Sequence, residues 1–145
     1  MASRFKIISS GLERERGSVF FYPHPADDIT IDRIANYKGK DLYYLLVEDE
    51  KILGYGILRG WDEGYQTPSL GIAISPCVRG SGLGTLLMNF LHVAASRRGS
   101  RKVRLRVLKN NKKAISLYKN SGYVFKKDIK QPDYLVGFKI LGISM

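Results

Sequence analysis

The chain has 145 residues, of which 44% are hydrophobic, and a net charge of +11 at pH 7, so we expect a single domain over residues 1–145 with a buried core. Its single cysteine excludes an intramolecular disulfide, and no apolar run reaches the roughly 18 residues that a membrane-spanning helix requires. The N-terminal residues lack the long apolar run of a secretory leader, so a cytoplasmic protein is expected.

The first forty residues predict a strand followed by irregular structure. Residues 5–9 (FKIIS) are apolar enough for a first strand. In residues 11–36, LERER is compatible with a short helix, and the two prolines of FFYPHP indicate a loop. Asp27 or Asp28 could cap a further helix start.

The next segments are rich in strand signals. Residues 42–48 (LYYLLVE) and 51–60 (KILGYGILRG) are apolar runs joined by a polar turn, which predicts a hairpin. Residues 67–74 (TPSLGIAI) form a third run. Its continuous hydrophobicity from Leu70 predicts a central strand that is covered on both faces.

A helix is predicted over residues 82–98, directly after a glycine-rich loop. Apolar residues recur at helical spacing, so this stripe is expected to face the core. Because His92 lies off the stripe, it is expected on the solvent side. The predicted stripe comprises Leu83, Leu86, Leu87, Phe90 and Ala94.

The last third alternates strand and helix. Residues 101–107 (RKVRLRV) alternate strictly, which predicts a strand with one basic face. Residues 111–122 predict a helix that begins at Asn111 as N-cap and ends before Gly122. Residues 123–129 and 133–141 predict a final strand pair. The order of elements indicates a mixed α/β domain whose glycine loop joins a strand to a helix.

The glycine loop, RGSGLG at residues 79–84, is typical of an anion site, because free N–H groups and the helix dipole meet at a helix start. A Walker A loop would need a lysine after its last glycine, and Thr85 stands there. A dinucleotide fingerprint would need a glycine at that same position and an acid about 20 residues on, and neither is present. Both of these phosphate-binding loops are therefore excluded.

A third pattern fits. RGSGLG matches [RQ]-x-x-G-x-[GA] through Arg79, Gly82 and Gly84, and NKKAISLYKNSGY matches N-x-x-A-x-x-L-Y-x-x-x-G-[FY] from Asn111 to Tyr123. With both signatures in this order, the chain resembles the GNAT superfamily of N-acetyltransferases over nearly its whole length, least clearly in residues 10–40. The resemblance implies a mixed, mainly antiparallel sheet with splayed central strands and flanking helices.

The resemblance also implies acetyl-CoA as acetyl donor. Its pantetheine arm would pair with the backbone of residues 72–74, whose side chains belong to the core, and Asn111 would contact the same arm or act only as a helix cap. The pyrophosphate would lie on the loop. The expected cofactor-binding residues are thus Ile72, Ala73, Ile74, Arg79, Gly80, Ser81, Gly82, Leu83, Gly84 and Asn111.

Tyr118 is expected to be catalytic. A phenol (pKa about 10) can hydrogen-bond to or protonate the departing thiolate of CoA (pKa about 8.5). The acceptor, a primary amine, would attack the thioester directly in a ternary complex. It must first lose a proton, for which Glu63 or Asp62 is the candidate base. Trp61, Tyr22 and His24 are further candidates for the acceptor site, and no metal is expected.

Charge is divided unevenly along the chain. Residues 1–63 hold 9 Lys and Arg against 11 Asp and Glu, whereas residues 64–145 hold 15 Lys and Arg against only Asp128 and Asp133. The basic half fits an anionic cofactor, and the acidic half a cationic amine. A weak similarity favours an amino sugar or other small amine as acceptor; a protein N-terminus or a lysine is the alternative. A basic nucleic-acid-binding or acyl-CoA-sensing module is the rival class. A monomer or a homodimer is expected.

Overall fold

A seven-stranded sheet organises the part of the chain that the computed structural model describes, namely residues 5–9, 37–49 and 51–142. The predicted loop and helix starts in residues 11–36 lie outside the described residues. The strands are β1 (Phe5–Ser9), β2 (Leu42–Glu48), β3 (Lys51–Arg59), β4 (Ser69–Ile74), β5 (Lys102–Leu108), β6 (Val124–Lys127) and β7 (Tyr134–Ile140); the helices are η1 (Pro76–Val78), α2 (Leu83–Arg97) and α3 (Lys112–Asn120).

The strands are arranged in the order β1-β2-β3-β4-β5-β7-β6. Every neighbouring pair is antiparallel except β4 and β5, which are parallel. The expected mixed, mainly antiparallel sheet is therefore confirmed. The predicted strands at residues 5–9, 42–48, 51–60, 67–74 and 101–107, the two helices around residues 82–98 and 111–122, and the final strand pair are all present, with shifts of a few residues at their ends.

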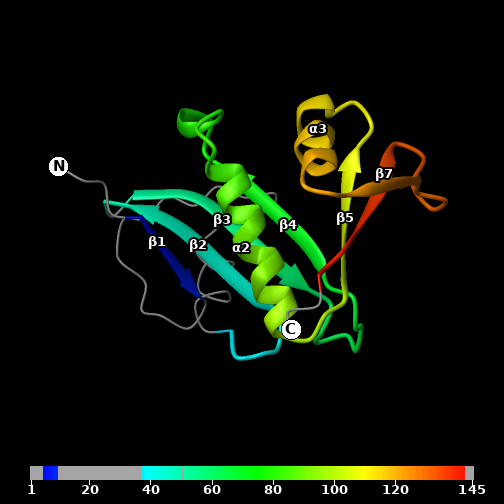
Figure 1. Cartoon of the computed structure of the whole chain (residues 1–145), viewed down its shortest axis with the longest axis horizontal. Coiled ribbons are helices and arrows are strands. Elements are labelled where there is room, and N and C mark those ends of the chain that lie inside the picture. The colour runs from blue at the N-terminus through cyan, green and yellow to red at the C-terminus, as the bar shows by residue number, and fades with distance from the viewer. Residues whose placement is uncertain (1–4, 10–36, 50, 143–145) are drawn as a thin grey trace.

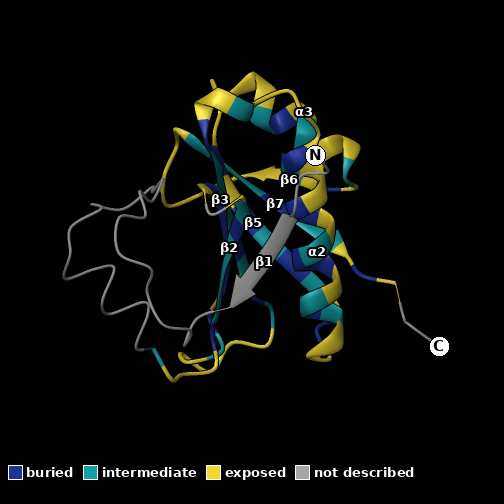
Figure 2. Cartoon of the chain, turned by 90° about the vertical axis from the view of Figure 1, so that its left-hand side faces the viewer, coloured by how far each residue is buried: buried dark blue, intermediate teal, exposed yellow. Residues whose placement is uncertain are grey.

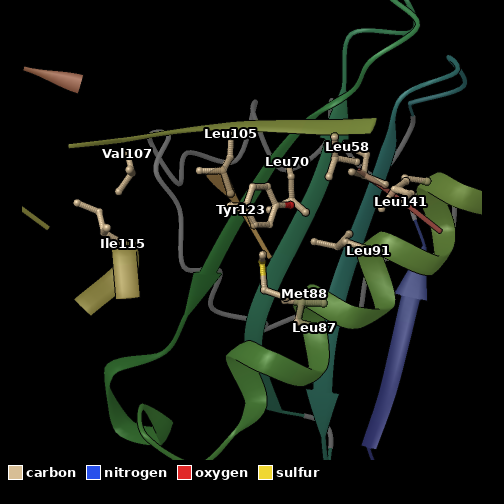
Figure 3. Packing of buried hydrophobic residues seen from close by; sticks show 12 residues of the cluster. Leu58, Leu70, Leu87, Met88, Leu91, Leu105, Val107, Ile115, Tyr123 and Leu141 are labelled. Atoms are coloured by element: carbon tan, nitrogen blue, oxygen red, sulfur yellow. The ribbon is translucent and has the colours of Figure 1, made fainter. Parts of the chain in front are cut away.

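Helix α2 packs on the sheet over β3 and β4 (Figure 1). Its buried side chains follow one helical face, and Leu87, Met88 and Leu91 are fully buried, each contributing about 1.5–3 kcal/mol by leaving water. The helix approaches β3 closely at Gly56, where an added Cβ would lie 3.0 Å from the Leu91 side chain. Figure 3 shows Leu87, Met88 and Leu91 meeting Leu58 and Leu70 from the sheet.

The predicted stripe of α2 was wrong in part. Leu83 and Leu87 are buried, but Leu86 is 45% exposed. His92, expected on the solvent side, is buried at 8% exposure. The sequence from Leu86 to Ala95 is apolar almost throughout, so apolar residues occur on more than one face of the helix. Packing buries the face that includes Leu91 and His92, which is rotated from the predicted stripe. The buried residues of α2 are Leu83, Leu87, Met88, Leu91, His92 and Ala95.

The strands of the sheet combine buried and half-buried residues (Figure 2), and β4 and β5 differ in how far they are buried. In β5 the alternation predicted from sequence is confirmed, because Val103, Leu105 and Val107 are buried. Strand β4 is central in the sheet as expected, but only Leu70 in it is buried, so the expectation that both faces are covered was wrong. The reason is the position of β4 in the sheet, since it borders the place where the sheet opens.

Candidate active site

The sheet opens between β4 and β5. These parallel strands pair at one position only, Ser69 with Arg104, where the backbone N–H of Arg104 donates to the carbonyl oxygen of Pro68 at 3.0 Å. Beyond that pair the strands diverge toward their C-terminal ends (Figure 1). The splayed central strands expected from sequence are therefore confirmed, and the facing edges of β4 and β5 are left without a ladder between them.

The backbone of β4 offers polar groups to this opening at alternate residues. The N–H of Ser75 donates to Leu53 on the β3 side at 2.8 Å. Because backbone groups alternate sides along a strand of unbroken register, Ala73 also faces β3, whereas Ile72 and Ile74 face the opening. Of the three residues expected to bind a pantetheine arm through their backbone, two thus present it on the correct side.

The glycine loop lies at the end of β4 and opens α2. Gly80 and Gly82 have φ angles of +78° and +84°, a region that other residues rarely adopt. Gly82 is the N-cap, with no side chain to cap the helix, so the first N–H groups of α2 lack the usual side-chain acceptor. A Cβ added to either glycine would meet nothing within 4 Å, so the space above the loop is open. This geometry suits a phosphate group.

Other residues of the loop fix the conformation of the glycine loop. Arg79 donates from Nε to the carbonyl oxygen of Ile74 at 3.4 Å, which ties the loop to the end of β4. Ser81 donates from its hydroxyl to the carbonyl oxygen of Val78. Leu83 is buried, so only its backbone can face a ligand. Gly84 lies where an added Cβ would be 3.7 Å from Leu117 of α3, so α3 flanks the loop.

Helix α3 begins as predicted. The Asn111 side chain accepts a hydrogen bond from the backbone N–H of Ala114 at 3.2 Å, which confirms Asn111 as the N-cap. The same helix carries Leu117, which lies next to Gly84 of the glycine loop, and Tyr118 is the residue that follows it. The loop and the open edge of β4 thus meet at one opening, and α3 lies beside the loop.

Tyr118 is half-buried and packs against aromatic neighbours. Its ring lies edge-on to Tyr123 at 5.9 Å between centroids and 6.5 Å from Phe125. Burial raises the pKa of the Tyr118 phenol above 10, because the phenolate would lose hydration. Tyr118 is therefore protonated at neutral pH and can act as a hydrogen-bond donor, as its expected role toward a leaving thiolate requires.

Tyr123, which contacts the ring of Tyr118, forms a buried polar pair with His92. His92 Nε2 lies 2.8 Å from the Tyr123 hydroxyl, and both residues are buried. Burial first, and then the charge of Lys139, lowers the pKa of His92 from 6.5 to about 4, so the ring is neutral at pH 7. Sequence reasoning missed this pair, although Tyr123 was visible as the last residue of the second signature.

We expect Tyr123→Phe to destabilise the fold by about 1–3 kcal/mol, because it would leave the buried His92 nitrogen without its partner while keeping the ring contacts. Chemical denaturation of both proteins measures this difference. Tyr65→Phe is the matched control, since Tyr65 is 63% exposed. Equal unfolding midpoints for the wild type and Tyr123→Phe would show that the pair contributes nothing.

The loop of residues 60–68 lies at the other end of β4. It joins Arg59 to Ser69, which pair where β4 meets β5. At about 3.3 Å per residue, β4 is roughly 17 Å long. The expected base candidates Asp62 and Glu63 therefore lie at the opposite end of β4 from the glycine loop.

This loop is held by structural contacts. The buried Asp41 carboxylate accepts from the backbone N–H groups of Gly60 at 3.0 Å and Asp62 at 3.2 Å. Asp62 in turn accepts from the backbone N–H of Lys40 at 2.7 Å, and Arg98 stacks on Trp61 at 5.2 Å. Glu63 is exposed. The remaining acceptor candidates, Tyr22 and His24, lie outside the described residues.

No group of three or more His, Cys, Asp or Glu in residues 5–9, 37–49 and 51–142 is placed to hold a metal ion. Within the same part of the chain, none of the helices has the length and apolar character needed to cross a bilayer.

The family comparison agrees with this geometry. A model described as the acetyltransferase (GNAT) family matches residues 10–123, which is most of the chain. No curated protein sequence matches the chain.

Solved structures share the fold at low identity. A GNAT-family acetyltransferase structure from Desulfovibrio desulfuricans is 17% identical, with a TM-score of 0.74 over 96% of this chain and 100% of that one. The ribosomal-protein-S18-alanine N-acetyltransferase from Escherichia coli is 20% identical, with a TM-score of 0.68 over 97% of each chain. The PaiA N-acetyltransferase from Thermoplasma acidophilum, solved with coenzyme A, is 16% identical, with a TM-score of 0.64 over 76% of this chain and 65% of that one.

Proposed function

Because the chain belongs to the GNAT family of acetyltransferases, we propose that it transfers the acetyl group of acetyl-CoA directly to a primary amine in a ternary complex. The observation that carries this proposal is the opening itself, where the free backbone edge of β4 leads to the start of α2 at Gly82. Tyr118, whose phenol is protonated at neutral pH, lies on α3, the helix whose Leu117 flanks the glycine loop.

The residues around the opening fit the parts of acetyl-CoA. The backbone groups of Ile72 and Ile74 can pair with the amides of the pantetheine arm as a neighbouring strand would. The N–H groups from Gly82 to Gly84 can hold the pyrophosphate, with Arg79 beside them. The side-chain oxygen of Asn111 already accepts the hydrogen bond that caps the helix, so its amide nitrogen is the group available to a ligand.

The chemistry of the transfer is divided between donor and protein. Acetyl-CoA would supply the acetyl group as an activated thioester: the amine nitrogen would bond to the acetyl carbon as the carbon–sulfur bond breaks, and the amine would release its proton to solvent. Tyr118 stays protonated in its half-buried position and donates a hydrogen bond, or its proton, toward the sulfur that leaves. The N–H of Ile72 or Ile74 is a suitable donor for the carbonyl oxygen, because both groups face the opening.

The acceptor is proposed to be a small amine, with an amino sugar as the first candidate. A protein N-terminus is the second candidate, because the solved neighbours include a ribosomal-protein-alanine N-acetyltransferase from Brucella melitensis with a TM-score of 0.60. A panel of both kinds of amine, followed by release of free thiol from acetyl-CoA, distinguishes them. Turnover with peptides alone would overturn the small-amine assignment.

Glu63 has no role in the proposed mechanism, because its loop lies near the end of the opening where β4 and β5 are paired. We expect Glu63→Gln to leave kcat/KM unchanged for the best acceptor of the panel, since β4 separates Glu63 from the glycine loop by roughly 17 Å. Steady-state thiol release measures this. A loss in kcat as large as that caused by removing the Tyr118 hydroxyl would instead make Glu63 the base.

A further inference from the structure

A pocket of 530 Å³ lies on α3, away from the opening between β4 and β5. It lies between one face of this helix and the facing ends of β6 and β7. Its walls carry four lysines around an apolar floor: Lys109, Lys112, Lys119 and Lys127 surround Ile115 and Leu135. We call this feature the lysine pocket.

The lysine pocket is separate from the proposed acetyl-CoA site. At 100° per residue, Lys112, Ile115 and Lys119 lie on one side of α3. Leu117, which flanks the glycine loop, lies on the opposite side, and Tyr118 lies between the two sides. A molecule in the lysine pocket would therefore touch a different face of the helix.

The charges around the lysine pocket are unbalanced. No carboxylate lines it, and within the described residues none of its four lysines forms an ion pair. The nearby carboxylate of Asp128 is already paired with Arg106 at 3.1 Å. Four ammonium groups around one hollow repel each other and create a local positive potential, which an anionic partner would relieve.

The apolar residues at the floor of the lysine pocket indicate which class of anionic partner it binds. Ile115 and Leu135 provide an apolar surface, and the lysine stems extend it. No aromatic residue lines the pocket, so it offers no platform for stacking a nucleic-acid base. A polyphosphate would leave the apolar floor uncovered. An acidic peptide with one apolar side chain uses both features, because carboxylates reach the rim and the apolar group covers the floor.

We propose that the lysine pocket docks a short acidic segment of a partner protein, in which one apolar side chain lies between acidic residues. The binding does not depend on the acetyl transfer proposed above, so it is measured separately from activity. It also gives part of the excess positive charge of residues 64–145 a role beyond the cofactor.

The test uses a fluorescent peptide with one leucine flanked by two glutamates on each side, titrated with the full chain in an anisotropy assay. The double variant Lys112→Glu/Lys119→Glu is expected to bind it at least about tenfold more weakly. The matched control is Lys38→Glu/Lys51→Glu, which changes the net charge equally at two exposed lysines outside the pocket and should bind normally.

Three results would overturn the proposal. They are equal weakening in both double variants, equal binding of a peptide with serine in place of leucine, and no binding of the peptide at low salt. Displacement of the bound peptide by single-stranded RNA at lower concentration than by unlabelled peptide would assign the pocket to nucleic acid instead. Circular dichroism confirms folding, and Lys112→Gln/Lys119→Gln replaces the charge reversal if that variant unfolds.

Discussion

Replacing Tyr118 by phenylalanine is expected to lower kcat for acetyl transfer by about 10²-fold or more, the usual contribution of a positioned general acid. The KM for acetyl-CoA should change little, because phenylalanine keeps the ring contacts with Tyr123 and Phe125. Stability should also be preserved, since within the described residues the Tyr118 hydroxyl makes no hydrogen bond. Steady-state thiol release at saturating acceptor measures the effect.

The pH profile adds an independent check on Tyr118. Its folded pKa lies above 10, so the wild type should not lose activity through this group as the pH rises from 7 to 9. Tyr65→Phe, at an exposed position, serves as the control. Unchanged kcat in Tyr118→Phe would mean that the leaving thiolate is stabilised by another group.

Replacing Gly82 by glutamine is expected to weaken acetyl-CoA binding by at least about tenfold. Gly82 has a φ of +84°, so a side chain would strain the loop by roughly 1–2 kcal/mol and would also enter the open space where the phosphates are proposed to lie. Calorimetric titration with acetyl-CoA measures the dissociation constant directly.

Gly99 offers a matched control for this change. It follows the other end of α2, has a φ of +87° and also has nothing within 4 Å of an added Cβ. Gly99→Gln should therefore lose a similar amount of stability and yet bind acetyl-CoA normally. If both variants bind equally well, the glycine loop does not hold the phosphates; if both bind equally poorly, general destabilisation explains the loss.

Much of the fold followed from local sequence patterns. The strict alternation of residues 101–107 places Val103, Leu105 and Val107 in the core, and the structure agrees. Asn111 caps α3 because a short polar side chain there meets the free N–H of Ala114. These features depend on neighbours within a few residues, so periodicity and capping rules could identify them.

Features that depend on distant residues could not be read in the same way. The buried pair of His92 and Tyr123 joins positions 31 residues apart, and a polar residue on an amphipathic helix is ordinarily assigned to solvent. Asp41 fixes Asp62 across 21 residues, so a loop that resembled an acceptor site in sequence is braced from elsewhere in the chain. The exposed edge of β4 arises because β5 pairs with it at one position only.

In the proposed complex, acetyl-CoA lies between β4 and β5 with its phosphates on the glycine loop. Two-dimensional amide NMR of the labelled protein, titrated with acetyl-CoA, tests this most directly. The largest shifts are expected at the N–H groups of Leu83, Gly84, Ile72 and Ile74, with little change at Trp61. Largest shifts in the loop around Trp61, or no shifts at saturating acetyl-CoA, would contradict it.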